Sequence, residues 1–257
     1  MQRRLRERVG PDAATRRLAP RACLLLLATC VGACTPPPKI APRAIPAMPN
    51  GATDRPEAER RWYTTCFRMP FDADGKPEWA LDLLLADRVA APALSAHAAD
   101  IRLWRFHRRA AADAAGHQFS LLVYASAPTA ERLRERFDAD PTLRDLLASG
   151  RMSGVVHGCR AAQGTPDVEA TSDPAWDPSI QRAWPWFIMG VSASWLALIQ
   201  DLARDRPPVG ADPLPAYREI DGRIGQLWAA QGQHAFLHHL SGLYGYRPLR
   251  IETWMRY

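Results

Sequence analysis

Two consecutive segments in the middle of the chain have the composition of β-strands. Residues 101–108 intersperse apolar side chains with basic ones, whereas residues 117–124 are more apolar. Because side chains on a β-strand point alternately to its two faces, the first segment predicts a half-buried strand and the second a more buried one. Asp113 and Gly116 suit a loop, so we expect an antiparallel hairpin over about residues 101–124.

Apolar residues at helical spacing predict helices on both sides of this hairpin. The predicted helices are residues 78–90, 129–137, 142–149, 217–228 and 233–243. A short third strand is expected near residues 153–157. Together these patterns predict an α+β fold, in which helices cover a small antiparallel sheet and the C-terminal half is helical.

The longest helical pattern lies over residues 180–202, with no charged residue between Ala183 and Gln200. Its apolar side chains cover much of the helix circumference, so we expect a central buried helix. The alternatives are a membrane-inserting helix or a docking helix within residues 184–198. The run is a little short to span a bilayer and contains Pro185.

The N-terminal region has the layout of a secretory signal. Residues 1–21 are rich in arginine, and residues 22–33 form a short apolar segment that ends in small side chains. A helix of about twelve residues rises only about 18 Å, which is too short for about 30 Å of hydrocarbon. A plain transmembrane anchor is therefore not expected.

Four residues at the end of this segment resemble the lipobox of bacterial lipoproteins: Val31, Gly32, Ala33 and Cys34. The resemblance covers residues 1–34 only, and it implies that a signal peptide of residues 1–33 is removed and that Cys34 carries a palmitate-type anchor. Thr35 in place of aspartate implies sorting to the outer membrane. The alternatives are an uncleaved hydrophobic segment and a cleaved signal without lipid.

A proline-rich stretch follows. Residues 35–56 contain seven prolines and almost no large apolar side chains, a composition that favours an extended chain of about 3.1 Å per residue. We expect residues 34–59 to comprise the lipidated cysteine and a tether. Residues 60–257 then form one globular α+β domain that faces the periplasm, and the membrane is a partner through the lipid.

Composition and charge exclude several classes of protein. Of the 257 residues, 47% are hydrophobic, which is enough for a sizeable core and too many for a disordered or fibrous chain. Seven arginines and two acidic residues precede Cys34, so five of the six net positive charges lie there. The remaining chain is nearly neutral, and no nucleic-acid partner is expected.

Cys66 and Cys159 are the cysteines that remain beyond Cys34. In an oxidising compartment, two such residues predict a disulfide that closes a loop of about 94 residues. Because the sequence does not supply the distance between them, two separate cysteines are the alternative.

A histidine pair provides a metal-binding hypothesis. His234 and His238 are four residues apart in a predicted helix, so both imidazoles can reach one zinc or other transition-metal ion. A third ligand would come from elsewhere: His157, His117 or Glu219. Ala235 occupies the position of the general base in an HExxH motif, which gives no support for zinc-protease chemistry. The alternative is an ordinary polar helix face.

Arg102, Trp104 and Arg108 in the first strand, and Trp176 in a later loop, are candidate ligand-binding residues. Guanidinium groups bind anions such as lipid A phosphate or a carboxylated glycan, and exposed indole rings stack on sugars. Arginine outnumbers lysine 31 to 2. A solvated strand face is therefore the alternative for the arginines, and core packing is the alternative for the tryptophans.

No GxSxG, Walker A, GxGxxG or CxxCH motif occurs in the sequence. The leading hypothesis is a membrane-anchored periplasmic lipoprotein that binds or scaffolds an envelope protein or glycan, without catalysis and without a cofactor. The alternative is a metal-binding protein or metal-dependent enzyme that uses His234 and His238.

Overall fold

The computed structural model describes residues 59–111, 113, 116–204 and 212–246. The chain divides into two units, Met1–Ile45 and Pro46–Tyr257, and every described residue belongs to the second unit. Cys34, the signal segment, the tether and the tail after residue 246 lie outside the described residues.

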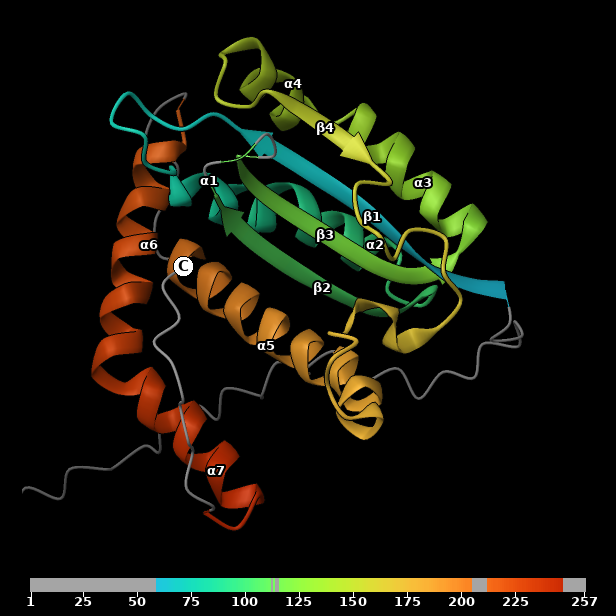
Figure 1. The fold of residues 1–257 in the computed structure, drawn as a ribbon. Helices are drawn as coiled ribbons and strands as arrows, with labels where there is room; N and C mark the ends of the chain where they lie inside the picture. Colours follow the sequence, from blue (N-terminus) through green and yellow to red (C-terminus); the bar gives the residue numbers. More distant parts are fainter. Residues whose placement is uncertain (1–58, 112, 114–115, 205–211, 247–257) are drawn as a thin grey trace, which may run out of the picture. The chain divides into compact units, whose positions relative to one another are not determined.

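Four antiparallel strands form one sheet in the order β2-β3-β1-β4 (Figure 1). The strands are β1 (Arg60–Met69), β2 (Ile101–Ala110), β3 (His117–Ser126) and β4 (Gly154–His157). β2 and β3 pair along their length, which confirms the predicted hairpin. β1 was not predicted from the sequence, yet this strand lies between β3 and β4 and has partners on both sides.

Helices connect these strands in the order of a split β-α-β motif. α1 (Trp79–Leu84) continues through η2 (Leu85–Ala90) into α2 (Ala91–Ala96), and α3 (Ala127–Asp138) and α4 (Pro141–Ala148) lead from β3 to β4. η2 is π-helical. Pro92 follows η2 and has no N–H, so it cannot continue the regular hydrogen-bond ladder of an α-helix.

β3 is buried along its whole length because both faces of the sheet are covered. Phe119, Leu121 and Val123 point into the main core, which they share with α1, η2, α2, α3 and α4. Leu122 and Tyr124 point the other way, into a smaller second core. The α+β architecture predicted from the sequence is confirmed, with the main core between the helices and one sheet face.

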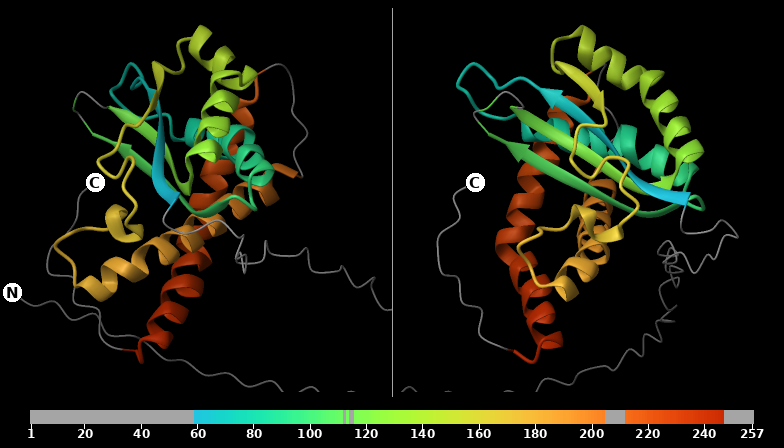
Figure 2. Two further views of the ribbon diagram at one scale, coloured as in Figure 1. Left: turned by 90° about the vertical axis from the view of Figure 1, so that its right-hand side faces the viewer. Right: turned by 45° about the vertical axis from the view of Figure 1, so that its right-hand side comes forward.

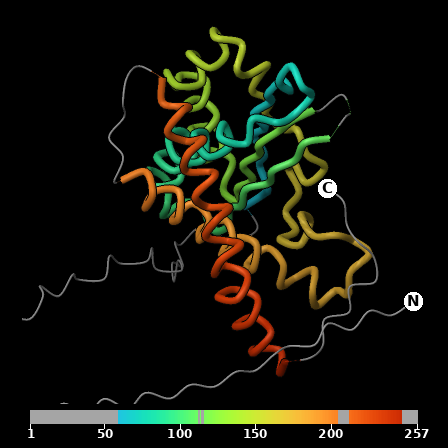
Figure 3. The backbone as a smooth tube through the Cα atoms, turned by 90° about the vertical axis from the view of Figure 1, so that its left-hand side faces the viewer, coloured from blue at the N-terminus to red at the C-terminus, as the bar shows by residue number. Residues whose placement is uncertain are grey.

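The C-terminal half of the chain is helical, as predicted. η3 (Val168–Thr171) precedes the long helix α5 (Pro178–Arg204), and α6 (Leu214–Leu227) continues through η4 (Trp228–His238) into α7 (His239–Leu243). Figure 3 shows α6, η4 and α7 as one continuous rod. α6 buries Leu214, Tyr217 and Ile220, whereas η4 and α7 bury no residue.

The prediction that residues 180–202 form a central buried helix is wrong. The buried residues of α5 recur every three or four positions, on one face: Pro185, Met189, Ser192, Leu196 and Ile199. Trp186, Phe187 and Val191 are exposed, because α5 lies along the edge strand β2 rather than between two layers (Figure 1). By length and composition alone, α5 is the one helix within the described ranges that could cross a membrane.

α5 also satisfies part of the open edge of β2. The backbone N–H of Phe106 donates to Ser192 Oγ at 3.1 Å, and the Ser192 hydroxyl donates to the Ile188 carbonyl oxygen at 2.8 Å. Unpaired backbone groups at a sheet edge are a template for unwanted strand pairing. Ser192 therefore gives this edge a specific acceptor.

We expect Ser192→Ala to lower the free energy of unfolding by about 1–3 kcal/mol, because the buried Phe106 N–H loses its acceptor. Ser194→Ala is the matched control, since the exposed Ser194 hydroxyl makes the same type of bond to the Gly190 carbonyl oxygen at 2.9 Å. Urea unfolding of both variants measures the difference. An equal loss of stability in the two variants would contradict the role of Ser192 at the sheet edge.

Candidate functional site

The sheet face that points away from α1 and α2 is partly covered by residues 158–168, here called the covering loop (Figure 2). Cys159 in this loop forms a disulfide with Cys66 of β1. Their Cα atoms are 6.1 Å apart, within the usual range for a disulfide. The structure thus contains the predicted cysteine pair, not two separate cysteines.

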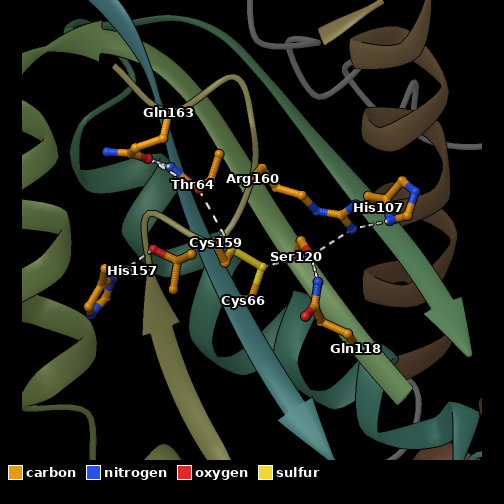
Figure 4. The surroundings of a disulfide bond; sticks show 10 residues. Thr64, Cys66, His107, Gln118, Ser120, His157, Cys159, Arg160 and Gln163 are labelled. Atoms are coloured by element: carbon orange, nitrogen blue, oxygen red, sulfur yellow. Dashed lines mark hydrogen bonds between the residues drawn. A yellow bond between two sulfur atoms is a disulfide. The ribbon is translucent and has the colours of Figure 1, made fainter. Parts of the chain in front are cut away.

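Hydrogen bonds hold the covering loop along β1. The Gly158 N–H donates to the Thr64 carbonyl oxygen and the Gly164 N–H donates to the Trp62 carbonyl oxygen, each at 2.8 Å. Gln163 Oε1 accepts from the Thr64 N–H at 2.9 Å. These bonds and the disulfide fix the path of the loop over the sheet (Figure 4).

Beneath the loop, this sheet face has an apolar half and a polar half. The apolar half is the second core, formed mainly by Trp62, Leu103, Leu122 and Tyr124. In the polar half, the strand register aligns two rows across β1, β3 and β2: Cys66, Ser120 and His107, and next to them Arg68, Gln118 and Arg109. Arg105 on β2 and Arg160 on the loop complete the polar half.

Arg105 and Arg160, here called the arginine cluster, are the charged groups of interest. Arg160 Nη2 donates to His107 Nδ1 at 2.6 Å and to Ser120 Oγ at 3.3 Å (Figure 4). Arg105 Nη2 donates to a backbone carbonyl oxygen in η3 at 3.4 Å. The Nε atoms of both arginines, and that of Arg68 on β1, are buried and have no hydrogen-bond partner.

The electrostatics of the cluster are unbalanced. Within the ranges that the structure describes, no carboxylate forms an ion pair with the cluster, and the nearby Arg109 is paired with Asp113. Burial, followed by the charge of Arg160, lowers the pKa of Arg105 to about 10, and burial also lowers the pKa of Arg160. Uncompensated positive charge of this kind attracts anions.

His107 lies among these charges. Burial, and then the charges of Arg160, Arg105 and Arg109, lower the pKa of His107 to about 4. The imidazole is therefore neutral at pH 7, and its Nδ1 accepts the hydrogen bond from Arg160. A neutral His107 can orient Arg160 without adding to the positive charge.

Two of the arginines selected from the sequence have other partners. Arg108 points to the helix-covered face, where it donates to the buried Asp82 at 2.7 Å and lies over the ring of Trp79. Arg102 is at an irregularity in the pairing of β2, and its guanidinium lies 5.6 Å from the ring centre of Trp186.

The two selected tryptophans are also separate. Trp104 is half-buried and packs against both cores, with its ring 5.1 Å from that of Phe106. Trp176 is 37% exposed, and its ring lies 5.0 Å from that of Trp184 at the start of α5. The four residues selected as ligand-binding therefore contact different parts of the fold.

Arg160 was not among the residues predicted from the sequence, because only the disulfide was expected of the segment around Cys159. The two faces of β2 were not distinguished either. The alternation of the strand contained a usable signal, since Arg105 and His107 are two residues apart and share a face, whereas Arg108 belongs to the opposite face.

His234 and His238 lie on the exposed η4, with ring centres 4.8 Å apart and an angle of 13° between the ring planes. The candidate third ligands have other positions. His117 contacts Asp82 at 3.0 Å and His157 contacts Thr65 at 3.0 Å, both within the sheet region, whereas Glu219 lies on α6. Among the described residues, no group of three or more His, Cys, Asp or Glu is placed to hold a metal ion. Metal binding by the pair stays a prediction.

Comparisons with known proteins add little to this description. No family model matches the chain, and no curated protein matches it. A solved structure of a dimeric ferredoxin-like protein from an uncultured marine organism is similar, with 20% sequence identity and a TM-score of 0.28. The match covers 40% of this chain and 87% of that chain. At these values the similarity carries no inference about function.

Proposed function

We propose that this chain is an outer-membrane lipoprotein, anchored by lipid on Cys34, whose α+β domain faces the periplasm and binds a component of the cell envelope without catalysing a reaction. The lipobox resemblance at residues 31–34 supports the anchor. The Cys66–Cys159 disulfide supports export, because disulfides persist in oxidising compartments such as the periplasm and are rare in the cytosol.

The observation that carries the binding function is the arginine cluster on the loop-covered sheet face. Arg105 and Arg160 are half-buried, and burial lowers the pKa of both side chains. A charge that is withdrawn from water is costly unless an opposite charge compensates it, and a bound anion would supply that charge. The cluster therefore favours the binding of an anionic envelope component.

We expect labelled palmitate to be incorporated into the wild-type chain and not into the Cys34→Ser variant, because the acylated thiol is absent from the variant. Metabolic labelling followed by separation of inner and outer membranes measures both the lipid and the location. A labelled Cys34→Ser chain, or a wild-type chain in the cytosolic fraction, would disprove the anchor.

The metal alternative is tested on the same purified wild-type protein. Elemental analysis that finds about one zinc, copper or iron per chain, lost in the His234→Ala/His238→Ala double variant, would favour the metalloprotein. If the protein binds an envelope component as proposed, wild type and double variant have the same metal content and the same partners after crosslinking in intact cells.

A further inference from the structure

We propose that the polar half of the loop-covered sheet face is a binding site for a phosphoryl group, held by Arg105 and Arg160. This site would give the proposed envelope-binding function a class of ligand. It rests on that function only for the source of the ligand. The shared chemistry is a terminal phosphoryl group, which phosphatidic acid, a sugar phosphate or free inorganic phosphate can supply.

Arg105 and Arg160 lie on one patch of the sheet face although they come from different elements. Arg105 is two residues from His107 on β2, so the two side chains share this face. Arg160 on the covering loop donates to His107 Nδ1 at 2.6 Å and to Ser120 Oγ at 3.3 Å, and its charge contributes to lowering the pKa of Arg105. Positive charges from β2 and the covering loop therefore meet beside His107.

A phosphoryl group fits this patch better than a carboxylate. A phosphate monoester carries about −1.5 to −2 charges at pH 7 and has three strong acceptor oxygens. Arg105 and Arg160 carry two positive charges, and among the described residues neither forms an ion pair with a carboxylate. A carboxylate has one charge and two oxygens, so it leaves more of the positive charge and of the donors unsatisfied.

The surroundings favour a defined site over a loose basic surface. The disulfide and the backbone bonds of the covering loop hold Arg160 in place, and neutral His107 accepts one of its N–H groups. Preorganised donors lose little conformational entropy when the anion binds. The arginines are also partly withdrawn from water, which strengthens their attraction for an anion.

The test uses the full chain, purified from membranes in dodecyl maltoside. Isothermal titration at constant ionic strength measures binding of inorganic phosphate, short-chain phosphatidic acid, glucose 1-phosphate and succinate. We expect at least one phosphate compound to bind more tightly than succinate. Arg105→Gln and Arg160→Gln should each weaken that binding about tenfold or more, the effect of losing one charge-assisted hydrogen bond.

Arg144→Gln is the matched control, because Arg144 is exposed on α4 and its guanidinium donates only to the Ala139 carbonyl oxygen at 3.4 Å. Its affinity should equal that of the wild type. Arg160→Lys keeps the charge but loses the fork of donors, so an intermediate affinity is expected. The compound that binds most tightly identifies the source of the phosphoryl group.

A second measurement needs no variant and so does not depend on folding of the mutants. Phenylglyoxal modifies arginines in the wild-type chain, and mass spectrometry locates the products. Phosphate should slow modification of the arginine cluster and leave Arg144 unaffected. Equal affinity for succinate and the phosphate compounds, unchanged affinity in both glutamine variants, or no protection of the cluster would overturn the site. Such a result would not affect the proposed lipid anchor on Cys34. Conversely, failure of palmitate labelling would not affect the proposed phosphoryl site.

Discussion

Loss of the Cys66–Cys159 disulfide is expected to lower the free energy of unfolding by about 4–5 kcal/mol. The two cysteines are 93 residues apart in the sequence, so the bond removes a large amount of conformational entropy from the unfolded chain. It also attaches the covering loop to the centre of β1, where Cys66 is fully buried. Urea unfolding of the wild-type chain and the Cys66→Ala/Cys159→Ala variant measures the difference.

Dithiothreitol provides an internal control for this experiment. It should destabilise the wild-type chain by a similar amount and leave the double alanine variant unchanged, because the variant has no Cys66–Cys159 bond to reduce. A difference below about 1 kcal/mol between the two chains would contradict the expected contribution of the long loop.

Asp82→Ala should lower the free energy of unfolding by about 3–5 kcal/mol, the usual result of removing one partner of a buried ion pair. The Asp82 carboxylate is fully buried in α1 and contacts His117 Nε2 at 3.0 Å and Arg108 Nε at 2.7 Å. His117 is also fully buried, and its Nδ1 has no hydrogen-bond partner in the structure. Without Asp82, the imidazole would lose the hydrogen-bond partner of its Nε2 and Arg108 would lose a charged acceptor.

Asp201→Ala is the matched control on the surface. Asp201 pairs with Arg204 at 3.0 Å at the end of α5, and both side chains are largely exposed. Such pairs contribute about 0–1 kcal/mol. Thermal and urea unfolding should therefore separate the two variants clearly, and similar small losses in both would show that the Asp82 network does not stabilise the fold.

The β2–β3 hairpin, which was predicted, and β1, which was not, show which strands the pattern of apolar and polar residues can identify. β2 has one face in contact with the main core and the other partly polar, so its pattern was visible in the sequence. In β1, residues 64–67 are all buried because the sheet is covered on both faces. A strand buried on both faces loses the alternation that identifies it.

The burial of α5 could not be predicted from its composition. A helix with apolar residues around much of its circumference is usually a core helix, but the degree of burial depends on how many elements surround it. α5 contacts β2, η3, α6 and η2, and its buried residues recur on one face only. Its outward residues, Trp186, Phe187 and Val191, therefore remain exposed.

The candidate site depended on the sheet register. The sequence indicated anion-binding arginines in β2, but the alternation along the strand sends Arg108 to Asp82 and Arg105 to the loop-covered face. Arg160 reaches His107 across 53 residues of sequence. No local pattern specifies such a contact, because it arises from the path of the covering loop over the sheet.

The sequence by itself determined the α+β class, the hairpin and the helical C-terminal half, because the direction of side chains in strands and helices imposes periods of 2 and 3.6 on local sequence. Cysteine number and expected compartment also selected the pair Cys66 and Cys159 before their positions were known. Only the tertiary structure decided which faces are buried and which charges meet, since both depend on contacts between distant segments. The arginine cluster belongs to this second group: Arg105 and Arg160 lie on one face of the sheet because the covering loop places Arg160 beside His107 of β2.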